Sequence, residues 1–159
     1  MASKLPLGWV LASACILSFT RAEVTGNLRI CVLRISFKED AKASTTGNGQ
    51  FLTLNEGLDC EFYQIDPPPH NQSYFESQLK GVDSYFRSVS YGNFGLDLNY
   101  SQIYPFDNSG YSLQNEMAYY HPYNQDDLHE SRLVALFQHS LEAAYVQDSI
   151  NFSNFDLVV

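Results

Sequence analysis

The segment from Asp127 to His139, DLHESRLVALFQH, combines residue types and a spacing that could bind a metal ion. Glu130 follows His129 directly, and His139 lies ten residues after His129. The outer histidines of the extended zinc motif H-E-x-x-H-x-x-G-x-x-H have the same spacing. In that motif two imidazoles one helical turn apart hold the ion, and the glutamate polarises the bound water. The segment is therefore the first candidate for a zinc site.

Two positions of that motif are filled by leucine, which argues against a zinc site of this kind. Leu133 stands in place of the middle histidine, and Leu136 stands in place of the glycine that turns the chain. Because leucine favours helix, the segment predicts one continuous helix. On such a helix His129 and His139 lie about 80° apart around the axis and about 15 Å apart along it. One zinc ion cannot contact both, so the pattern favours an ordinary amphipathic helix.

Two capping patterns predict where helices begin. In each pattern a side chain with an acceptor oxygen is followed three residues later by glutamate, which satisfies free backbone N–H groups in the first turn. The predicted helix caps are Ser73 with Glu76, and Asp127 with Glu130. Glu130 thus has a structural explanation that requires no metal.

Loop residues near the second helix offer a weaker alternative metal site, formed by His121, Asp126 and His129. The segment YNQDD, residues 123–127, also carries carboxylates and carbonyls of the kind that bind calcium. A solvated acidic loop explains the same residues. The metal content of the purified protein distinguishes these interpretations.

Hydrophobic periodicity predicts the order strand, helix, strand, helix, strand. Residues 27–37 are apolar on both faces, as in a strand that is covered from both sides. Further strands are expected at 94–106 and 154–159, and short ones in FLTL (51–54) and CEFYQI (60–65). Helices are expected from about Ser73 to Gly92 and from about Leu128 to Gln147.

The two helices show apolar stripes with helical spacing. The stripes consist of Phe75, Leu79, Val82, Phe86 and Val89 in the first helix, and of Leu133, Phe137, Leu141 and Ala144 in the second. Helices that connect strands favour a parallel sheet. The sequence therefore predicts an α/β (α+β) fold with a twisted, mostly parallel sheet and two main packed helices.

The amino terminus predicts export. Residues 1–22 have a basic start, an apolar run and a small final residue, which is typical of a signal peptide cleaved after Ala22. The apolar run is shorter than the ~20 residues that cross a bilayer, so no stable membrane span is expected after cleavage. A lipid anchor at Cys15 is a weaker alternative. We expect residues 23–159 to form one secreted, periplasmic or extracellular unit.

The net charge bears on which partners the protein can bind, and the cysteines bear on whether it contains a disulfide. The formal net charge is −9, and an acidic surface repels phosphate backbones, so no nucleic-acid partner is expected. In an oxidising compartment Cys31 and Cys60 could form a disulfide. Two buried free thiols explain the same pair equally well, and the sequence leaves both interpretations open.

Three blocks of the chain together resemble a known family. The first is the strand LRICVLRISF (28–37), and the second is the helix-then-strand block YFESQLKGVDSYFRSVSYGNFGLDLNY (74–100). The third is LVALFQHSLEAAYVQDSINFSNFDLVV (133–159). Their order and spacing over residues 27–159 resemble the secreted immune inhibitor A-like zinc metallopeptidases. The matching positions are Tyr85, Phe86, Val89, Ser90, Tyr91, Gly92, Asn93 and Phe94 in the second block, and Asn151, Phe152, Ser153, Phe155 and Asp156 in the third, where Asn151 replaces the usual aspartate.

The resemblance implies a zincin-like fold and peptide-bond hydrolysis by zinc-activated water, with a protein or peptide as substrate. It places the zinc-binding H-E-x-x-H helix after Val159, so no residue of this chain maps onto a zinc ligand or the catalytic glutamate. The apolar ending DLVV agrees with a chain truncated within a domain. On this interpretation the chain is the N-terminal part of a metallopeptidase-like domain and is inactive alone.

The main alternative is a complete, non-catalytic exported binding domain. Residues 107–125 are rich in tyrosine and asparagine, and aromatic rings among amides suit contacts with protein or glycan. Buried tyrosines would explain the same composition. The expected difference is that a binding domain needs no metal and no further catalytic helix.

Overall fold

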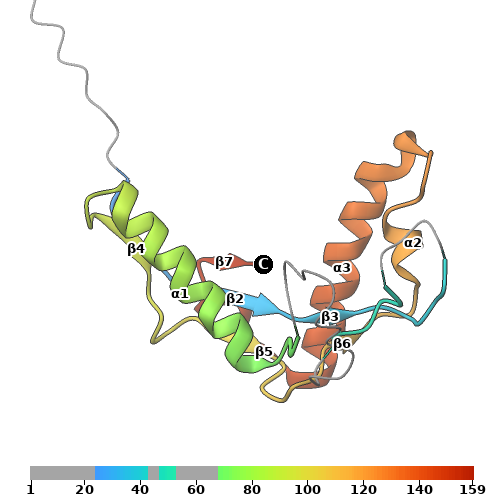
Figure 1. Ribbon diagram of the computed structural model, residues 1–159, viewed down its shortest axis with the longest axis horizontal. Helices are drawn as coiled ribbons and strands as arrows, with labels where there is room; N and C mark the ends of the chain where they lie inside the picture. The colour runs from blue at the N-terminus through green and yellow to red at the C-terminus, as the bar shows by residue number, and fades with distance from the viewer. Residues whose placement is uncertain (1–23, 43–46, 53–67) are drawn as a thin grey trace, which may run out of the picture.

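The computed structural model describes residues 24–42, 47–52 and 68–159 (Figure 1). The described strands are β1 (Gly26–Leu28), β2 (Ile30–Leu33), β3 (Ile35–Ser36), β4 (Phe94–Leu96), β5 (Gln102–Tyr104), β6 (Tyr111–Ser112) and β7 (Leu157–Val158). The helices are α1 (Gln72–Val89), α2 (Met117–Tyr120) and α3 (His129–Asp148), with short 3-10 turns η1 (Asp126–Leu128) and η2 (Phe152–Asn154). The two long helices begin within one residue of their predicted starts.

All strand pairs in the described part of the chain are parallel. β1, β2 and β3 follow one another from Gly26 to Ser36, and they pair in the same order with β4, β5 and β6. β7 pairs with the other side of β2, so the central order is β5-β2-β7. Parallel strands need a crossover, which α1 and α3 provide. The predicted α/β fold with a mostly parallel sheet and two packed helices is confirmed.

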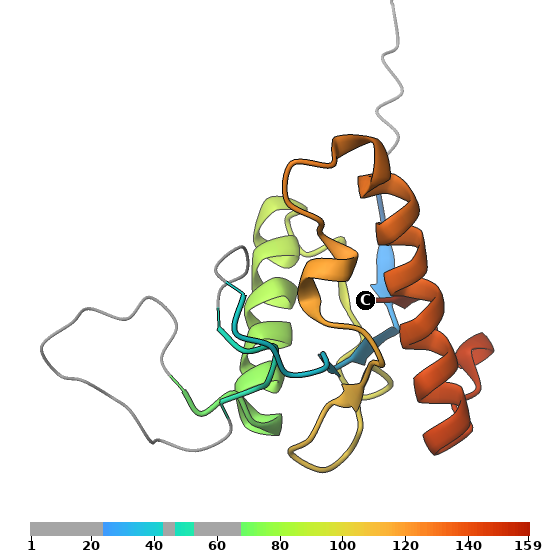
Figure 2. The same ribbon diagram turned by 90° about the vertical axis from the view of Figure 1, so that its right-hand side faces the viewer.

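The two long helices cover opposite faces of the segment 26–36. Cys31 belongs to a buried cluster with Ala144 of α3. The guanidinium of Arg34 instead lies 5.8 Å from the ring centre of Phe75 of α1. Successive strand side chains point to opposite faces, so Cys31, Leu33 and Ile35 face α3 and Arg34 faces α1. Figure 2 shows α1 and α3 on the two sides of the strands. The prediction of coverage on both faces is confirmed for β2 and β3, whereas Asn27 in β1 is exposed.

Arg34 is a buried charged residue that the sequence did not single out. Its side chain is 2% exposed, and its Nη2 donates to the carbonyl oxygens of Pro105 and Asp107. Burial lowers the pKa of Arg34, although the carboxylate of Asp107 acts in the opposite direction. Arg34 therefore holds the loop after β5 against the central strand, because a buried guanidinium requires these acceptors.

The predicted strand 94–106 is divided by a turn at residues 97–101. Ser101 N donates to Asp97 O at 2.8 Å, which closes the turn. The hydroxyl of Ser101 accepts from Ile30 N at 3.0 Å and thereby attaches the turn to β2. The turn lies opposite Arg29, which separates β1 from β2. The backbone N–H of Arg29 donates to the Asp156 side chain and not to the backbone of a neighbouring strand. Alternation of apolar residues cannot show such a break, because it is made by partners far away in the sequence.

Only part of the apolar stripe predicted for α3 packs closely, because Ala144 is buried and Leu133 and Phe137 are exposed. Ala144 is 0% exposed and Ser140 is 7% exposed, whereas Leu133 is 53% and Phe137 is 54% exposed. Small side chains let the helix approach the strands, so the large residues border the contact. The stripe of α1 is also only partly buried, since Val82 is 40% exposed.

Two further predictions about elements need correction. Phe51 and Leu52 form no strand, and the rest of FLTL and all of CEFYQI lie outside the described residues. The segment 107–125, predicted as irregular, contains β6 and the short helix α2. Both are too short to give a periodic pattern, and both are held in place by partners elsewhere in the chain.

Candidate functional site

The two histidines that prompted the zinc hypothesis lie on one continuous helix and have different partners. α3 runs without a break from His129 to Asp148. The Nε2 of His129 lies 3.0 Å from Pro122 O, and the Nδ1 of His139 lies 2.9 Å from the hydroxyl of Tyr120. The prediction of one continuous helix through His129 and His139 is confirmed.

The weaker metal alternative places its three residues close together. The rings of His121 and His129 are 4.8 Å apart between centroids, and Asp126 Oδ1 lies 3.8 Å from His129 Nδ1. The side chain of Asp126 is 94% exposed. Among residues 24–42, 47–52 and 68–159, no group of three His, Cys, Asp or Glu side chains is arranged to hold a metal ion, including those of the predicted calcium segment 123–127.

Both predicted capping boxes are wrong in their capping residue. Asn71 caps α1, because its backbone is extended and its Oδ1 accepts from Tyr74 N at 3.1 Å. Ser73 lies inside the helix and donates its hydroxyl to Asn71 Oδ1 at 2.8 Å, so Glu76 has no capping partner. A cap needs an extended residue before the first turn, and that residue, Asn71, lies two residues before the predicted Ser73.

At α3 the 3-10 turn η1 leads directly into the helix. Asp127 lies within η1, and the residue before α3, Leu128, has helical backbone angles and makes no side-chain cap. Asp127 is therefore not the predicted cap. Glu130 does lie in the first turn of α3, where a negative charge suits the helix dipole.

Cys31 is the described half of the predicted disulfide. Its side chain is 0% exposed, and burial raises the pKa of its thiol to about 11, so the thiol is neutral near pH 7. Cys60 lies outside the described residues. Pairing of Cys31 with Cys60 stays a prediction.

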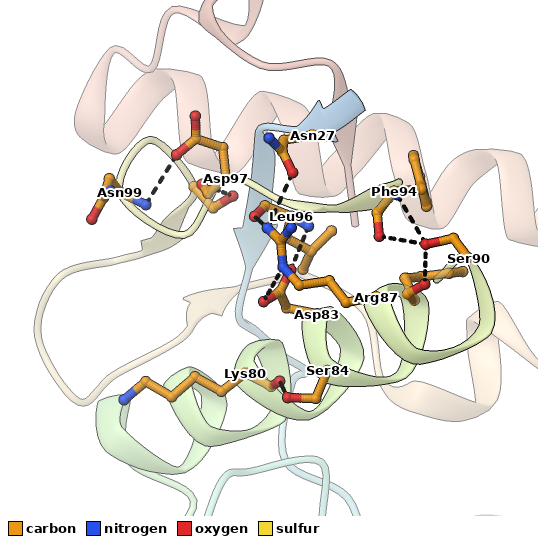
Figure 3. A network of polar contacts seen from close by, with 12 residues as sticks. Asn27, Lys80, Asp83, Ser84, Arg87, Ser90, Phe94, Leu96, Asp97 and Asn99 are labelled. Atoms are coloured by element: carbon orange, nitrogen blue, oxygen red, sulfur yellow. Dashed lines mark hydrogen bonds and ion pairs between the residues drawn. The ribbon is translucent and has the colours of Figure 1, made fainter. Parts of the chain in front are cut away.

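The second family-like block forms a polar joint between α1 and β4, drawn in Figure 3. Asp83 Oδ1 accepts from Leu96 N at 2.7 Å, and Asp83 Oδ2 accepts from Arg87 Nε at 3.0 Å. Arg87 Nη2 also donates to Leu96 O at 3.0 Å and to Asn27 Oδ1 at 3.1 Å. A Cβ at Gly95 would lie 2.6 Å from Asp83 Oδ1, so glycine is needed there. Desolvation raises the pKa of Asp83, but these hydrogen bonds outweigh it and lower that pKa.

The turn after α1 completes this joint. The hydroxyl of Ser90 donates to Phe86 O at 2.7 Å and accepts from Phe94 N at 2.9 Å (Figure 3). Gly92 has φ +84 and donates its N–H to Arg87 O at 2.7 Å, as a helix-terminating glycine does. Tyr91 is 94% exposed. The family-like residues in this block thus position a strand.

The third block forms a second joint. Asn151 Oδ1 accepts from Ser153 N at 3.2 Å and from Ser153 Oγ at 2.7 Å, which caps η2. Arg29 holds Asp156 with three bonds, Nη2 to Oδ1 at 2.8 Å, Nε to Oδ2 at 3.1 Å and its backbone N to Oδ2 at 2.9 Å. The bonds from Arg29 lower the pKa of Asp156 to about 2. This joint aligns β7 with β2.

A cavity lies between α3 and residues 112–115, which comprise the last residue of β6 and the three residues after it. Its volume is about 460 Å³. The polar groups in its lining include Gln114, Asn115, His139, Glu142 and Gln147. The cavity therefore combines part of the predicted binding segment 107–125 with one face of α3.

His139 is held in this cavity by a buried tyrosine. Tyr120 is 5% exposed, and its ring lies 5.6 Å from that of Phe37 between centroids. Its hydroxyl contacts His139 Nδ1 at 2.9 Å and lies 3.5 Å from Asn115 Nδ2. Because Nδ1 is occupied, Nε2 is the ring nitrogen available to a ligand. The arrangement can recognise a small polar molecule.

Comparisons with known proteins give no family assignment. No family model, curated protein or solved structure matches this chain. Of the helices in the described ranges, none has the length and apolar character that a membrane crossing requires. The site must therefore be argued from its own geometry.

Sequence reasoning did not find the role of Tyr120 or its contact with His139. His139 and Glu142 are three residues apart and so lie on one helix face, which was the available signal. Tyr120 precedes His139 by 19 residues, and only the packing of α2 on α3 brings them together.

Proposed function

We propose that this chain is the N-terminal scaffold of a secreted zinc metallopeptidase-like domain and that it does not hydrolyse peptide bonds alone. The observation that carries the proposal is where the family-like blocks lie. Ser90 and Gly92 fix the connection from α1 to β4, and Asp156 fixes β7 on β2 through Arg29. These blocks therefore shape a parallel sheet, which is the role that the resemblance implies for them.

The chemistry would come from a further helix. In the described part of the chain no three-ligand group could hold zinc. The proposal expects an H-E-x-x-H helix encoded after Val159, with its glutamate as general base toward zinc-activated water. Residues of the present chain would position that helix and contribute no ligand.

The decisive experiment is to sequence the transcript beyond the codon for Val159. An in-frame H-E-x-x-H shortly after that codon is the expected result. A stop codon directly after Val159 would refute the scaffold proposal and favour the binding-domain alternative.

Purified protein gives a second, independent test. The chain of residues 1–159, expressed with secretion, should contain no stoichiometric zinc and should not cleave casein. The chain extended through the encoded H-E-x-x-H helix should bind stoichiometric zinc and cleave casein. Its Glu→Gln variant at that motif should still bind zinc but should not cleave casein. Stoichiometric zinc together with cleavage by residues 1–159 alone would overturn the proposal.

A further inference from the structure

We propose that the cavity between α3 and residues 112–115 is a binding site for a small, hydroxyl-rich ligand of the sugar class. The inference is separate from the peptidase proposal, because the cavity is formed by the segment 107–125 and the α3 face, and not by the joints around β4 and β7. Its volume of about 460 Å³ suits one or two sugar rings.

Several polar side chains meet at this cavity without internal partners. Gln114, Glu142 and Gln147 line it, and their side chains make no hydrogen bond or ion pair within the described ranges. They come from two elements that are distant in sequence. A ligand can therefore bond to them without breaking bonds that hold the fold.

His139 is oriented before any ligand arrives. Asn115 Nδ2 lies 3.5 Å from the Tyr120 hydroxyl and can donate to it. The hydroxyl lies 2.9 Å from His139 Nδ1 and donates to it when His139 is the tautomer with its proton on Nε2. In this arrangement His139 Nε2 carries the proton and is a donor, whereas the Glu142 carboxylate is an acceptor one turn further along α3.

The polar and apolar side chains that line the cavity indicate which class of ligand it can bind. No Lys or Arg is found among the described residues that line the cavity, and Glu142 is acidic, so a phosphate or carboxylate ligand is disfavoured. Amides both donate and accept, which matches neighbouring hydroxyls that do the same. Leu113, Ala143 and Val146 supply apolar wall for the C–H face of a sugar ring. A polyol satisfies all three features together.

The test is saturation-transfer NMR on the full chain with methyl α-mannoside, methyl β-galactoside and N-acetylglucosamine as probes. At least one probe should show saturable binding. Glu142→Gln should weaken it about tenfold, since a hydrogen bond to a charged acceptor is lost. Tyr120→Phe should weaken it several-fold, because it removes only the hydroxyl that orients His139.

Controls separate binding from folding. Glu130→Gln makes the same chemical change on the same helix outside the cavity and should leave probe binding unchanged. Thermal melts of all variants should be cooperative and similar. Absence of binding by every probe overturns the proposal, as does binding that Glu142→Gln does not weaken. Saturable binding of putrescine with no sugar binding also overturns it, because it assigns the site to protonated amines.

Discussion

Asp83 of α1 and Glu142 of α3 are carboxylates with opposite environments. On the α1 side, Asp83 and Arg87 are joined to each other and to both backbone groups of Leu96. On the α3 side, Glu142 faces a cavity and has no hydrogen-bond or ion-pair partner in the described ranges. One carboxylate therefore stabilises the fold, whereas the other is available to bind a ligand.

This difference shows that the position of a residue in a sequence motif does not tell whether its side chain is free to bind a ligand. Asp83 and Arg87 lie in a joint where their side chains have partners, so substitution there should affect folding. Gln114, Glu142 and Gln147, whose side chains have no hydrogen-bond partner in the described ranges, line the cavity instead. A polar side chain that is fully partnered in the fold has little capacity left for a ligand, so partners are a better guide than residue type.

Breaking the α1 joint should have the largest effect on stability. Asp83→Ala removes the acceptor of Leu96 N–H and leaves Arg87 without its carboxylate, so the free energy of unfolding should fall by about 2–3 kcal/mol. Urea titration followed by circular dichroism measures it. The neighbouring Ser84→Ala loses only a bond to Lys80 O and should change stability by less than about 0.5 kcal/mol. Equal losses would contradict the joint.

The packing face of α3 provides the next comparison. Ala144→Leu inserts volume at a fully buried position and should lower the free energy of unfolding by about 1–3 kcal/mol. Phe137→Ala shortens a side chain that is 54% exposed and should cost less than about 1 kcal/mol. The same urea titration decides. The reverse order would mean that the large residues, and not the small ones, face the strands.

The joint between Arg29 and Asp156 predicts sensitivity to acid. The folded pKa of Asp156 is about 2, below the unfolded value of about 3.9. A depressed carboxyl pKa contributes stability that is present above pH ~4 and is lost as the pH falls toward ~2. Asp156→Asn should therefore flatten the melting temperature across that window. Asp126→Asn, at an exposed carboxylate, should retain the wild-type slope; matching slopes for all three proteins would exclude the joint.

The smallest expected effect concerns reactivity, not stability. Burial and a pKa of about 11 should make the Cys31 thiol react far more slowly with iodoacetamide in native protein than in urea. Peptide mass spectrometry reads the label at Cys31. Rapid labelling of the native protein would show that the α3 core opens. Protection that persists in urea and disappears with reductant would instead establish a disulfide.

Local patterns predicted much of the fold. The double apolar alternation of 27–37 predicted the strands that the two helices cover, and apolar spacing predicted both long helices, which begin within one residue of the predicted starts. The spacing of His129 and His139 on a continuous helix excluded a shared zinc ion. These predictions succeed because they depend on backbone geometry within one element, which the sequence states directly.

Other features were decided by tertiary structure. The predicted helix caps were wrong because capping depends on backbone angles, which are extended at Asn71 and helical at Leu128. The exposed stripe of α3 and the break at Ser101 follow from contacts between distant segments. The pattern of residue types within one segment does not show which distant segment will contact it.

The sequence by itself determined the α/β class, the parallel order of the strands and the helical nature of the segment that contains His139. Only the tertiary structure decided that Tyr120 orients His139 and that residues 112–115 close a cavity beside Glu142. The physical reason is distance along the chain. Periodicity reports which way each side chain points within its own element, whereas a site is formed by side chains from elements whose separation is set by packing.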